Sequence, residues 1–456
     1  MIPIAEIIRA TKGRRLWFIK CLVYDFFAAL WRRCLRRTTF IAITGSFGKS
    51  TTKECLAAAL SSRWPIVKTL GNGNGFGRIS RTIFAARPWH RFVVIEVGTE
   101  RPGMIRHWAR VVNPDIAVIV GVGGAHSLSF TSLEAIAEEK ASLLKGLRPG
   151  GLAVLNGDDP RVAAAARQAL PKGREVVWFG SSPSWEVTAH DIKAQWPERL
   201  SFTAQTSQGS VRCQTQFVGE HWVRSILASL TVALRVGVPL EEAAQAIGRV
   251  TPLPGRVQPV SLPNGAVILR DDTNSCLDAF KTSLAVLKDA RHVRRVFVSN
   301  GYTEDAANSR QRLLHLGELA AASADVAVFF GQYGKDGRRA AIRHGISSEN
   351  AHVFKTMRQT ADFLRTQIRQ DDLVLLKGRF SSHICRLLFA HVADIKCWVT
   401  NCDKRILCDR CPELGVSPDV LARYGPLTQF DETFLSPDDS AATDRRNEGL
   451  DGGKAA

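Results

Sequence analysis

The chain has 456 residues, 45% of them hydrophobic, which is enough for two or three domains with sizeable cores. Its formal net charge of +18 favours anionic partners, such as nucleotide phosphates, an acidic precursor or an anionic membrane surface. Nucleic acid is not the expected partner, because no helix-turn-helix, RNA-recognition or zinc-finger pattern is present, and no apolar run reaches the ~18 residues of a membrane-spanning helix.

Residues 1–37 form a basic, amphipathic N-terminal segment, in which an apolar stretch (16–31) lies between two arginine clusters within 14–37. Lys20 and Asp25 interrupt the stretch. One interpretation is peripheral contact with an anionic membrane, in which arginines meet headgroups and aromatic side chains enter the lipid; these are Trp17, Phe18, Phe26, Phe27 and Trp31. The alternative is a helix packed on the protein itself, or a dimer contact.

We interpret residues 38–254 as a central ATP-binding domain. Short apolar runs at 40–44, 92–96, 116–120 and 152–155 alternate with helical stretches, which is typical of parallel strands in a doubly wound domain. From about residue 176 to 217 the pattern changes to short alternating segments, which predict a small antiparallel section. A helix is expected at about 222–236.

A second βα series occupies residues 255–396, after a Pro- and Gly-containing linker at 252–256. Its apolar runs at 266–269, 295–299, 326–330 and 373–376 predict a Rossmann-like α/β domain. The fold class is therefore α/β, with a central P-loop doubly wound domain and a C-terminal Rossmann-like domain. Residues 418–456 are polar and acidic, and we expect them to be disordered.

A glycine-rich turn follows the first predicted strand and opens a helix. Its spacing, G-x-x-G-K-S-T-T, is shorter than the usual Walker A motif, but the physical logic is the same. Backbone N–H groups and the helix N-terminus cradle phosphates, a lysine meets the β/γ-phosphates, and a hydroxyl ligates Mg²⁺. The sequence therefore predicts an ATP site with these residues: Gly45, Ser46, Gly48, Lys49, Ser50 and Thr51.

Two further residues follow apolar strands in the same domain. Glu96 ends one strand, and the carboxyl ends of parallel strands are where ligands bind in open α/β sheets. His126 follows another strand through a glycine-rich stretch. The carboxylate of Glu96 is therefore well placed for a metal held by ATP, to which the hydroxyl of Ser50 or Thr51 would also bind.

The run from Ile41 to Glu54 resembles the Mur ligase family, and is nearest the branch that adds D-alanyl-D-alanine to the peptidoglycan precursor. The resemblance continues in order over much of the chain. It implies that Glu96 and His126 bind Mg²⁺ and that Lys140, on the helix with Ile136, is carbamylated and supports a metal. Lys49, Glu96, His126 and Lys140 are then the catalytic residues.

The same resemblance assigns further contacts. Asn72 and Asn74, in a glycine-rich loop, are expected beside the substrate, and Lys377 is expected to hold an acyl or ATP phosphate. Nucleotide contacts are expected from Asn156 on the adenine side and from a set in the C-terminal domain, namely Arg256, Asp272 and Asn274.

The implied reaction joins a carboxylate to an amine. The carboxylate attacks the γ-phosphate of ATP, and the amine then attacks the acyl phosphate. The setting is cytoplasmic cell-wall or envelope polymer synthesis, with membrane association on the cytoplasmic face through 14–37. Few residues precede the first strand, so a polymeric or lipid-linked carboxylate is a hypothesis beside the peptidoglycan precursor.

Departures from the family pattern keep two rivals open. Gly75, Trp222 and Arg379 stand where the family has other residues, as expected of a catalytically reduced ATP-binding scaffold or subunit of a ligase complex. An ordinary P-loop ATPase is the second rival, but it leaves the motifs after Asn156 unexplained. Retention of the four predicted catalytic residues favours the ligase.

A cluster of four cysteines lies within residues 397–417. Four thiolates are a common structural Zn²⁺ set, and one pair has the C-x₂-C spacing of such sites. The candidate zinc ligands are Cys397, Cys402, Cys408 and Cys411. Reduced cysteines without metal are the alternative, since the absence of a secretory signal indicates a reducing compartment.

Overall fold

The computed structural model describes residues 15–71, 73–124, 129–303, 308–400, 402, 404 and 406–424. The chain divides into two compact units, Met1–Pro252 and Leu253–Ala456. Each unit has its own sheet and is described by itself. No helix among the described residues is long and apolar enough to cross a membrane.

The N-terminal unit is built on one sheet, whose described strands have the order β2-β3-β1-β4-β5-β6-β7-β8-β9. Pairing is parallel from β2 to β7 and antiparallel in β7–β8–β9. The strands are β1 (Thr39–Thr44), β2 (Ile66–Lys68), β3 (Phe92–Glu96), β4 (Ile116–Ile119), β5 (Leu152–Asn156), β6 (Glu175–Gly180), β7 (Val187–Lys193), β8 (Ser201–Thr206) and β9 (Gly209–Gln214). The doubly wound prediction is confirmed. The predicted antiparallel section begins later than expected, because β6 continues the parallel sheet and only β8 reverses direction.

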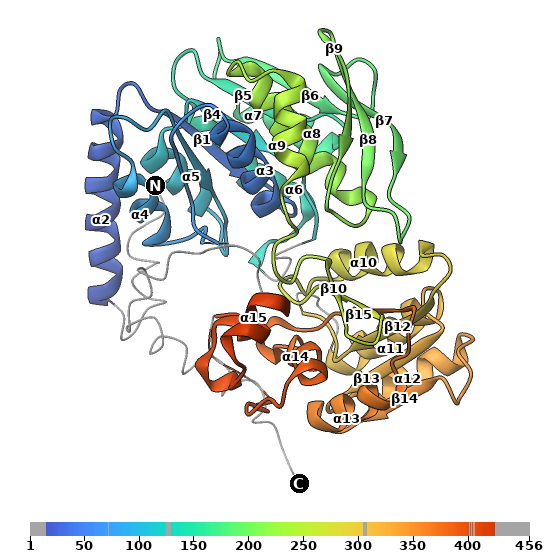
Figure 1. Ribbon diagram of the computed structural model, residues 1–456. Helices are drawn as coiled ribbons and strands as arrows, with labels where there is room; N and C mark the ends of the chain where they lie inside the picture. The colour runs from blue at the N-terminus through green and yellow to red at the C-terminus, as the bar shows by residue number, and fades with distance from the viewer. Residues whose placement is uncertain are drawn as a thin grey trace. The chain divides into compact units, whose positions relative to one another are not determined.

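Helices cover both faces of this sheet (Figure 1). Helices α3, α8 and α9 pack against one another on one face, and α2 packs on α4 and α5 on the other. The helices are α2 (Arg15–Cys34), α3 (Lys49–Ser61), α4 (Arg78–Ala85), α5 (Met104–Val112), α6 (Leu133–Ala141), α7 (Pro160–Ala169), α8 (Val223–Arg235) and α9 (Leu240–Gly248), with short 3₁₀ turns η2 (Leu144–Gly146) and η3 (Glu220–Trp222).

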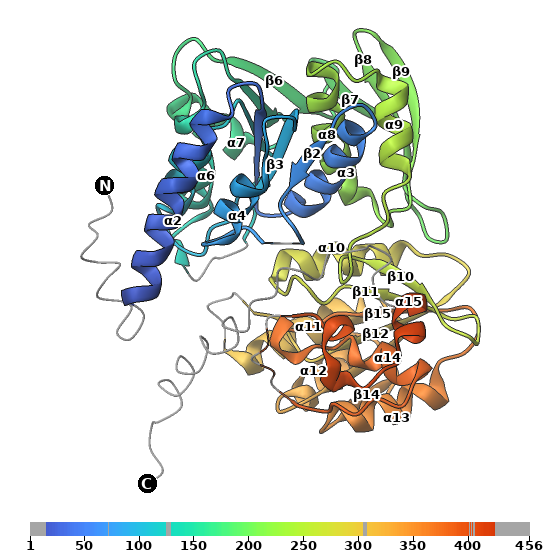
Figure 2. The same ribbon diagram turned by 60° about the vertical axis from the view of Figure 1, so that its left-hand side comes forward.

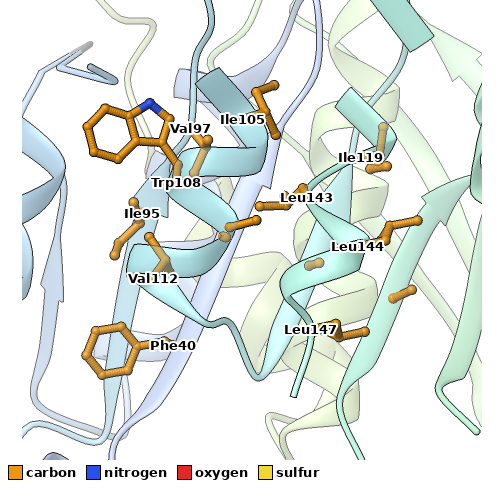
Figure 3. Close-up of a cluster of buried hydrophobic side chains, with 14 of the residues drawn as sticks. Phe40, Ile95, Val97, Ile105, Trp108, Val112, Ile119, Leu143, Leu144 and Leu147 are labelled. Atoms are coloured by element: carbon orange, nitrogen blue, oxygen red, sulfur yellow. The ribbon is translucent and has the colours of Figure 1, made fainter. Parts of the chain in front are cut away.

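The core of this unit lies between the sheet and α5, as Figure 3 shows. Strands β1 and β3 are buried along almost their whole length, as expected of central parallel strands covered on both faces. Trp108 of α5 is fully buried against this face, with its ring centroid 5.0 Å from that of Phe76. The packing holds the carboxyl ends of β1, β3 and β4 in fixed register, and that edge carries the predicted phosphate loop.

The C-terminal unit contains a second sheet, whose described strands have the order β10-β11-β15-β12-β13-β14. Only the β10–β11 pair is antiparallel. Its strands are β10 (Gln258–Ser261), β11 (Val267–Arg270), β12 (Arg294–Ser299), β13 (Val326–Phe330), β14 (Ala351–Phe354) and β15 (Asp372–Leu376). Its helices are α10 (Leu277–Asp289), α11 (Ser309–Ala321), α12 (Gly334–Arg343), α13 (Met357–Gln367), α14 (Arg386–Val392) and α15 (Pro418–Tyr424), with 3₁₀ turns η4 (Phe380–Ser382), η5 (Cys408–Arg410) and η6 (Pro412–Leu414). The Rossmann-like prediction is confirmed.

The prediction of a disordered tail from residue 418 was wrong at its start. Residues Pro418–Tyr424 form α15, and Tyr424 is buried in the C-terminal core together with Cys408 and Leu414. These few apolar side chains gain enough burial to order a segment whose composition is otherwise polar. Residues 425–456 lie outside the described part of the chain.

Trp108 provides a test of this packing. Trp108→Ala should lower the free energy of unfolding by about 3–5 kcal/mol, because a fully buried indole is replaced by a cavity. Urea unfolding followed by circular dichroism measures the change. Trp89→Ala is the matched control, since Trp89 is 68% exposed and its loss should change stability by no more than about 0.5 kcal/mol. Equal effects of the two substitutions would contradict the assigned core.

Candidate active site

The loop between β1 and α3 is tied to the loop that follows β4. The backbone N–H of Ser46 donates to the carbonyl of Gly121 at 2.9 Å. The Ser46 hydroxyl donates to the carbonyl of Gly123 and lies 2.9 Å from that residue's own N–H. The Lys49 ammonium donates to the carbonyl of Gly45 at 2.8 Å, so it lies folded back over the loop. The geometry is that of a phosphate-binding turn at a helix N-terminus.

Gly48 is required by its surroundings. It caps α3 with a left-handed backbone (φ 80°), and a Cβ built on it would lie 2.6 Å from the hydroxyl oxygen of Ser225. Ser225 donates to the Gly48 carbonyl at 3.5 Å, and Ser229, one turn along α8, donates to the carbonyl of Thr52 at 3.0 Å. Helix α8 therefore packs against the phosphate loop and the first turn of α3 and holds them through these two hydrogen bonds. The sequence analysis assigned no role to these two serines, and a pair of hydroxyls one helical turn apart was the only available signal.

Glu96 is buried at the carboxyl end of β3, 1% exposed. One carboxylate oxygen, Oε1, accepts from the side-chain amide of Asn74 at 3.0 Å. The other, Oε2, is buried without a hydrogen-bond partner among the described residues. Such an oxygen is costly unless something binds it. This spare acceptor fits a divalent cation, as the sequence predicted.

The Asn74 loop packs closely on the residues that follow β3. The Gly98 N–H donates to the Asn74 carbonyl at 3.1 Å, and a Cβ at Gly98 would lie 2.5 Å from the Asn74 side chain. The loop is also held from α3, because the fully buried Lys53 ammonium donates to the carbonyls of Thr69, at 2.7 Å, and Gly71. Lys53 lies in the recognised motif, but the sequence analysis gave it no role.

Lys140 is 2% exposed on α6. Burial, and then the positive charge of Lys49, hold the pKa of its ammonium well below the usual range, although Glu139 acts in the opposite sense. No acceptor or ion-pair partner for this ammonium is found among the residues that the structure describes. The carboxylate of Glu139 forms hydrogen bonds with other groups, since its two oxygens accept the N–H groups of Gly103, at 2.7 Å, and Ile105, at 2.8 Å. The positive charges of Lys140 and Lys49 therefore act unfavourably on one another.

Asn156 bridges neighbouring strands at the same edge of the sheet. Its side-chain amide donates to the carbonyl of Val120 at 2.9 Å, and its oxygen accepts the N–H of Asp158 at 3.0 Å. Asp159 accepts the N–H of Val122 at 2.7 Å, which ties the loop after β5 to the loop after β4. The side chain of Asn156 is thus engaged within the protein, and its predicted contact with adenine stays a prediction.

Two predicted residues, Asn72 and His126, lie outside the described residues. The structure brings the remaining N-terminal set to one sheet edge and its adjoining helices: the phosphate loop, Asn74, Glu96, Lys140 and Asn156. Glu96 and the phosphate loop follow neighbouring strands, since β1 and β3 are paired with Ile43 opposite Glu96. Their roles in catalysis and binding stay predictions.

Within the C-terminal unit, Lys377 lies in a buried polar cluster. Its ammonium forms an ion pair with Asp271 and donates to the carbonyl of Asn274 at 3.0 Å. It also lies 4.9 Å from the ring centroid of Phe280. The Lys377 side chain is fully buried, and its ammonium is in contact with these groups. Its predicted contact with a phosphate remains untested.

Asp272 also has a partner within the fold. Arg270 donates to it at 3.0 Å and to Asp409 at 2.5 Å, and all three side chains are buried. The Arg270 guanidinium lowers the pKa of Asp272 against the opposing effect of burial, so the carboxylate is ionised. Asp409 belongs to the cysteine-containing segment, so this ion pair joins that segment to β11. Arg256 follows a tight turn and is half-buried.

The zinc site that the sequence predicts at the cysteine cluster stays a prediction. Cys397, Cys402, Cys408 and Cys411 line one small cavity together with His383. Among the described residues, however, no three His, Cys, Asp or Glu side chains are placed to hold a metal ion. The thiols face other partners: Cys408 faces His383 at 3.3 Å, Cys397 faces Arg386 at 3.7 Å and Cys411 faces Lys404 at 3.9 Å. Hydrogen bonds from Cys385 and His383 lower the pKa of Cys408 to about 5, although burial raises it.

Comparisons with known proteins agree with this arrangement. Residues 43–233 match the family model for the Mur ligase middle domain, and residues 255–380 match that for the Mur ligase glutamate ligase domain. The UDP-N-acetylmuramoyl-tripeptide–D-alanyl-D-alanine ligase of Mycobacterium bovis is 28% identical over 384 residues, which cover 79% of this chain and 74% of that relative. The Escherichia coli (strain K12) enzyme of the same name is 28% identical over 296 residues, 65% of each chain.

Solved structures are similar over most of the chain. A crystal structure of MurF from Acinetobacter baumannii has a TM-score of 0.73 at 27% identity, and the match covers 81% of this chain and 80% of that one. The structure of MurF ligase from Thermotoga maritima in complex with ADP has a TM-score of 0.68 at 25% identity, and covers 81% and 83%.

Proposed function

Because this chain belongs to the Mur ligase family, we propose that the sheet edge described above carries ATP-dependent amide-bond formation through an acyl phosphate. It is a MurF-like ligase, of a group of ATP-dependent ligases that form amide bonds in peptidoglycan biosynthesis. The observation that carries the assignment to this edge is the juxtaposition of a phosphate-binding turn with Glu96, whose second oxygen is buried and finds no hydrogen-bond partner in the described part of the chain.

Phosphate binding begins at the N-terminus of α3. The loop N–H groups and the positive end of the helix attract the β- and γ-phosphates. Lys49, which now donates to Gly45, is within reach of the same loop and exchanges that carbonyl for a phosphate oxygen. A substrate carboxylate attacks the γ-phosphorus, and the bond to the β-phosphate oxygen breaks, which gives an acyl phosphate and ADP. An amine then attacks the acyl carbon, phosphate leaves, and the amine loses a proton.

Mg²⁺ fits the donor set at this edge. Ser50 at the start of α3 and Glu96 at the end of β3 would hold it through hard oxygen ligands, with the imidazole of His126, which lies outside the described residues. When bound, the cation neutralises charge on the transferred phosphoryl group. The protein's own part is to keep Glu96 oriented, which Asn74 does through the 3.0 Å hydrogen bond to Oε1.

Lys140 is proposed to be carbamylated. A neutral amine adds to CO₂ and releases one proton, so a cation becomes an anion. Burial and Lys49 keep the pKa of Lys140 low, which favours the neutral amine that this addition needs. The resulting carbamate would face Lys49 and the metal ligands, and would relieve the repulsion between the two lysines.

The substrates are proposed by likeness to the matched relatives. A UDP-muramoyl-tripeptide would supply the carboxylate, and D-alanyl-D-alanine the amine. A lipid-linked or polymeric carboxylate is the alternative. The nucleotide contacts predicted for Asn156, Arg256, Asp272 and Asn274 belong to the same proposal, as do the substrate contacts of Asn72 and Lys377.

The first prediction concerns the reaction itself. With ATP, Mg²⁺ and the two proposed substrates, the purified protein should release ADP and form one new amide, detected by mass spectrometry. Lys49→Ala should lower kcat by about 10²–10³-fold, because a cation at the developing charge is lost. Lys172→Ala, at an exposed lysine, is the matched control and should leave kcat unchanged. ATP binding without turnover would direct the search to other carboxylates, and a protein that fails to bind ATP would refute the site.

The second prediction concerns Lys140. In ¹³C-bicarbonate buffer the protein should show a carbamate resonance that Lys140→Ala lacks, with kcat lowered by about 10- to 100-fold in the variant. Bicarbonate should raise activity, and activity should fall as the pH drops through the lowered pKa, because protonation removes the neutral amine. Lys145→Ala on the following exposed turn is the control. Full activity in bicarbonate-free buffer, with no resonance, would rule out carbamylation.

The third prediction separates positioning of Glu96 from folding. Gly98→Ala should displace the Asn74 side chain, because the new Cβ would lie 2.5 Å from it, and should lower kcat at least about tenfold. The midpoint of thermal unfolding should change little, since only the end of a flexible side chain must move. Gly75→Ala is the control, as a Cβ there meets nothing within 4 Å. The Mg²⁺ concentration for half-maximal rate should rise only in Gly98→Ala. Equal rates in both variants would contradict the proposed role of Asn74.

A further inference from the structure

Helix α2 buries Asp25 and Arg32 against the protein and presents large apolar side chains to solvent. On the inner side, Asp25 is 1% exposed, accepts a hydrogen bond from Ser80 and lies 2.9 Å from the Nε2 atom of His107. These contacts attach the helix to α4 and α5. Asp25, which interrupts the apolar run in the sequence, is thus held by partners inside the unit.

Arg32 anchors the other end of the same inner face. It is 2% exposed and donates to the carbonyls of Val112, at 2.9 Å, and Asn113, at 3.0 Å, and to the carboxylate of Asp115 at 2.8 Å. Its guanidinium also lies over the ring of Phe40, 3.9 Å from the centroid. The inner face is therefore fixed by a dense set of polar contacts as well as by Ala28 and Leu35.

The outer face consists of large apolar residues. They recur at spacings of three and four, which places them on one side of a helix. Their exposed fractions are 40–60%: Ile19 54%, Val23 50%, Phe26 60%, Phe27 54% and Leu30 40%. A helix at the surface of a protein in water normally places polar residues there. Figures 1 and 2 both show α2 at the margin of its unit, and the helix packs on α4 and α5.

Cations flank this apolar face without a nearby carboxylate on the same helix. Lys20, Arg33, Arg36 and Arg37 are exposed, and the only acidic residue between 19 and 37 is the buried Asp25. The face extends to the loop before β3, because Arg91 donates to the carbonyl of Arg37 at 3.0 Å. That loop carries Trp89, 68% exposed, with Arg87 and Arg91.

Trp31 corrects the sequence-based interpretation in one respect. It was expected to enter lipid, but its indole N–H donates to the carbonyl of Ala86 at 3.1 Å, so its polar edge faces the protein. Trp89, which the sequence analysis did not select, is the exposed indole in this region. The side chains of Trp17 and Phe18 lie outside the described residues.

We propose that the outer face of α2, with the Trp89 loop, docks the protein on the surface of an anionic lipid bilayer. The helix would lie in the plane of the interface, with Val23, Phe26 and Phe27 among the acyl chains and the arginines against phosphate headgroups. The apolar stripe gives affinity, and the cations select anionic lipid over neutral lipid. A second copy of this chain is disfavoured as the occupant, because two such faces would bring their arginines together. This inference does not depend on the proposed reaction.

Vesicle sedimentation of the full chain tests the proposal. We expect binding to phosphatidylcholine vesicles that contain about one third phosphatidylglycerol, and weak binding to phosphatidylcholine alone. The double substitution Phe26→Ser with Phe27→Ser should lower the partition coefficient at least about tenfold, since two apolar side chains no longer enter the membrane. Arg33→Gln with Arg36→Gln should remove the preference for phosphatidylglycerol and the sensitivity to salt.

The matched control replaces two apolar residues of similar exposure elsewhere, Ile192→Ser with Val399→Ser, and should bind as the unmodified chain does. Circular dichroism checks that every variant is folded. The proposal is overturned if the full chain does not sediment with phosphatidylglycerol vesicles, or if the control loses as much binding as the phenylalanine variant. It is also overturned if ultracentrifugation without lipid shows self-association that depends on Phe26 and Phe27 while vesicle binding is absent.

Discussion

The close approach of α8 to the phosphate loop is the constraint from which the arrangement of the active edge follows. Only a glycine can stand at position 48, because its backbone is left-handed and Ser225 occupies the space of a Cβ. That contact fixes where α3 begins, and hence where its N-terminal N–H groups point. The ties from Ser46 to the loop after β4 then place the neighbouring strand ends around the same point. The loop predicted to bind phosphate is thus shaped by its backbone conformation together with the hydroxyls of Ser46 and Ser225.

Bound ligands would improve the interactions of several charged groups around this point. Lys49 and Lys140 repel each other, and one oxygen of Glu96 is buried with no hydrogen-bond partner among the residues that the structure describes. A nucleotide triphosphate, a divalent cation and an anionic form of Lys140 would satisfy these groups together, which is why they are interpreted as one catalytic assembly. The C-terminal unit differs. The buried charged residues described there form ion pairs within the unit. Lys377 is paired with Asp271, and Arg270 lies between Asp272 and Asp409. Those pairs organise the fold and the cysteine-containing segment.

Buried polar contacts also explain the orientation of the N-terminal helix α2. Asp25 and Arg32 look like interruptions of an apolar run, yet each is held inside the unit by several hydrogen bonds. Once they face inward, helical periodicity places Phe26 and Phe27 outward, where both side chains are more than half exposed. The helix is therefore amphipathic with its polar side bound to protein. A bilayer surface is the environment that suits its other side.

Local patterns in the sequence were enough to predict the fold class, most of the central parallel strands and the glycine turn between β1 and α3. These depend on local patterns, since buried parallel strands need apolar runs and a phosphate turn needs its glycines, lysine and hydroxyls in consecutive positions. It also pointed to Glu96 and Lys140 through family likeness. Tertiary structure decided what depends on distant residues: the support of Gly48 by Ser225 and Ser229, the anchoring of the Asn74 loop by Lys53, and the burial of Lys377. It also placed the thiols of Cys408, Cys397 and Cys411 beside His383, Arg386 and Lys404, and it showed that Tyr424 orders a polar segment. Spacing along a chain indicates which groups are near in sequence, but partners and burial are set by packing between segments that lie far apart in it.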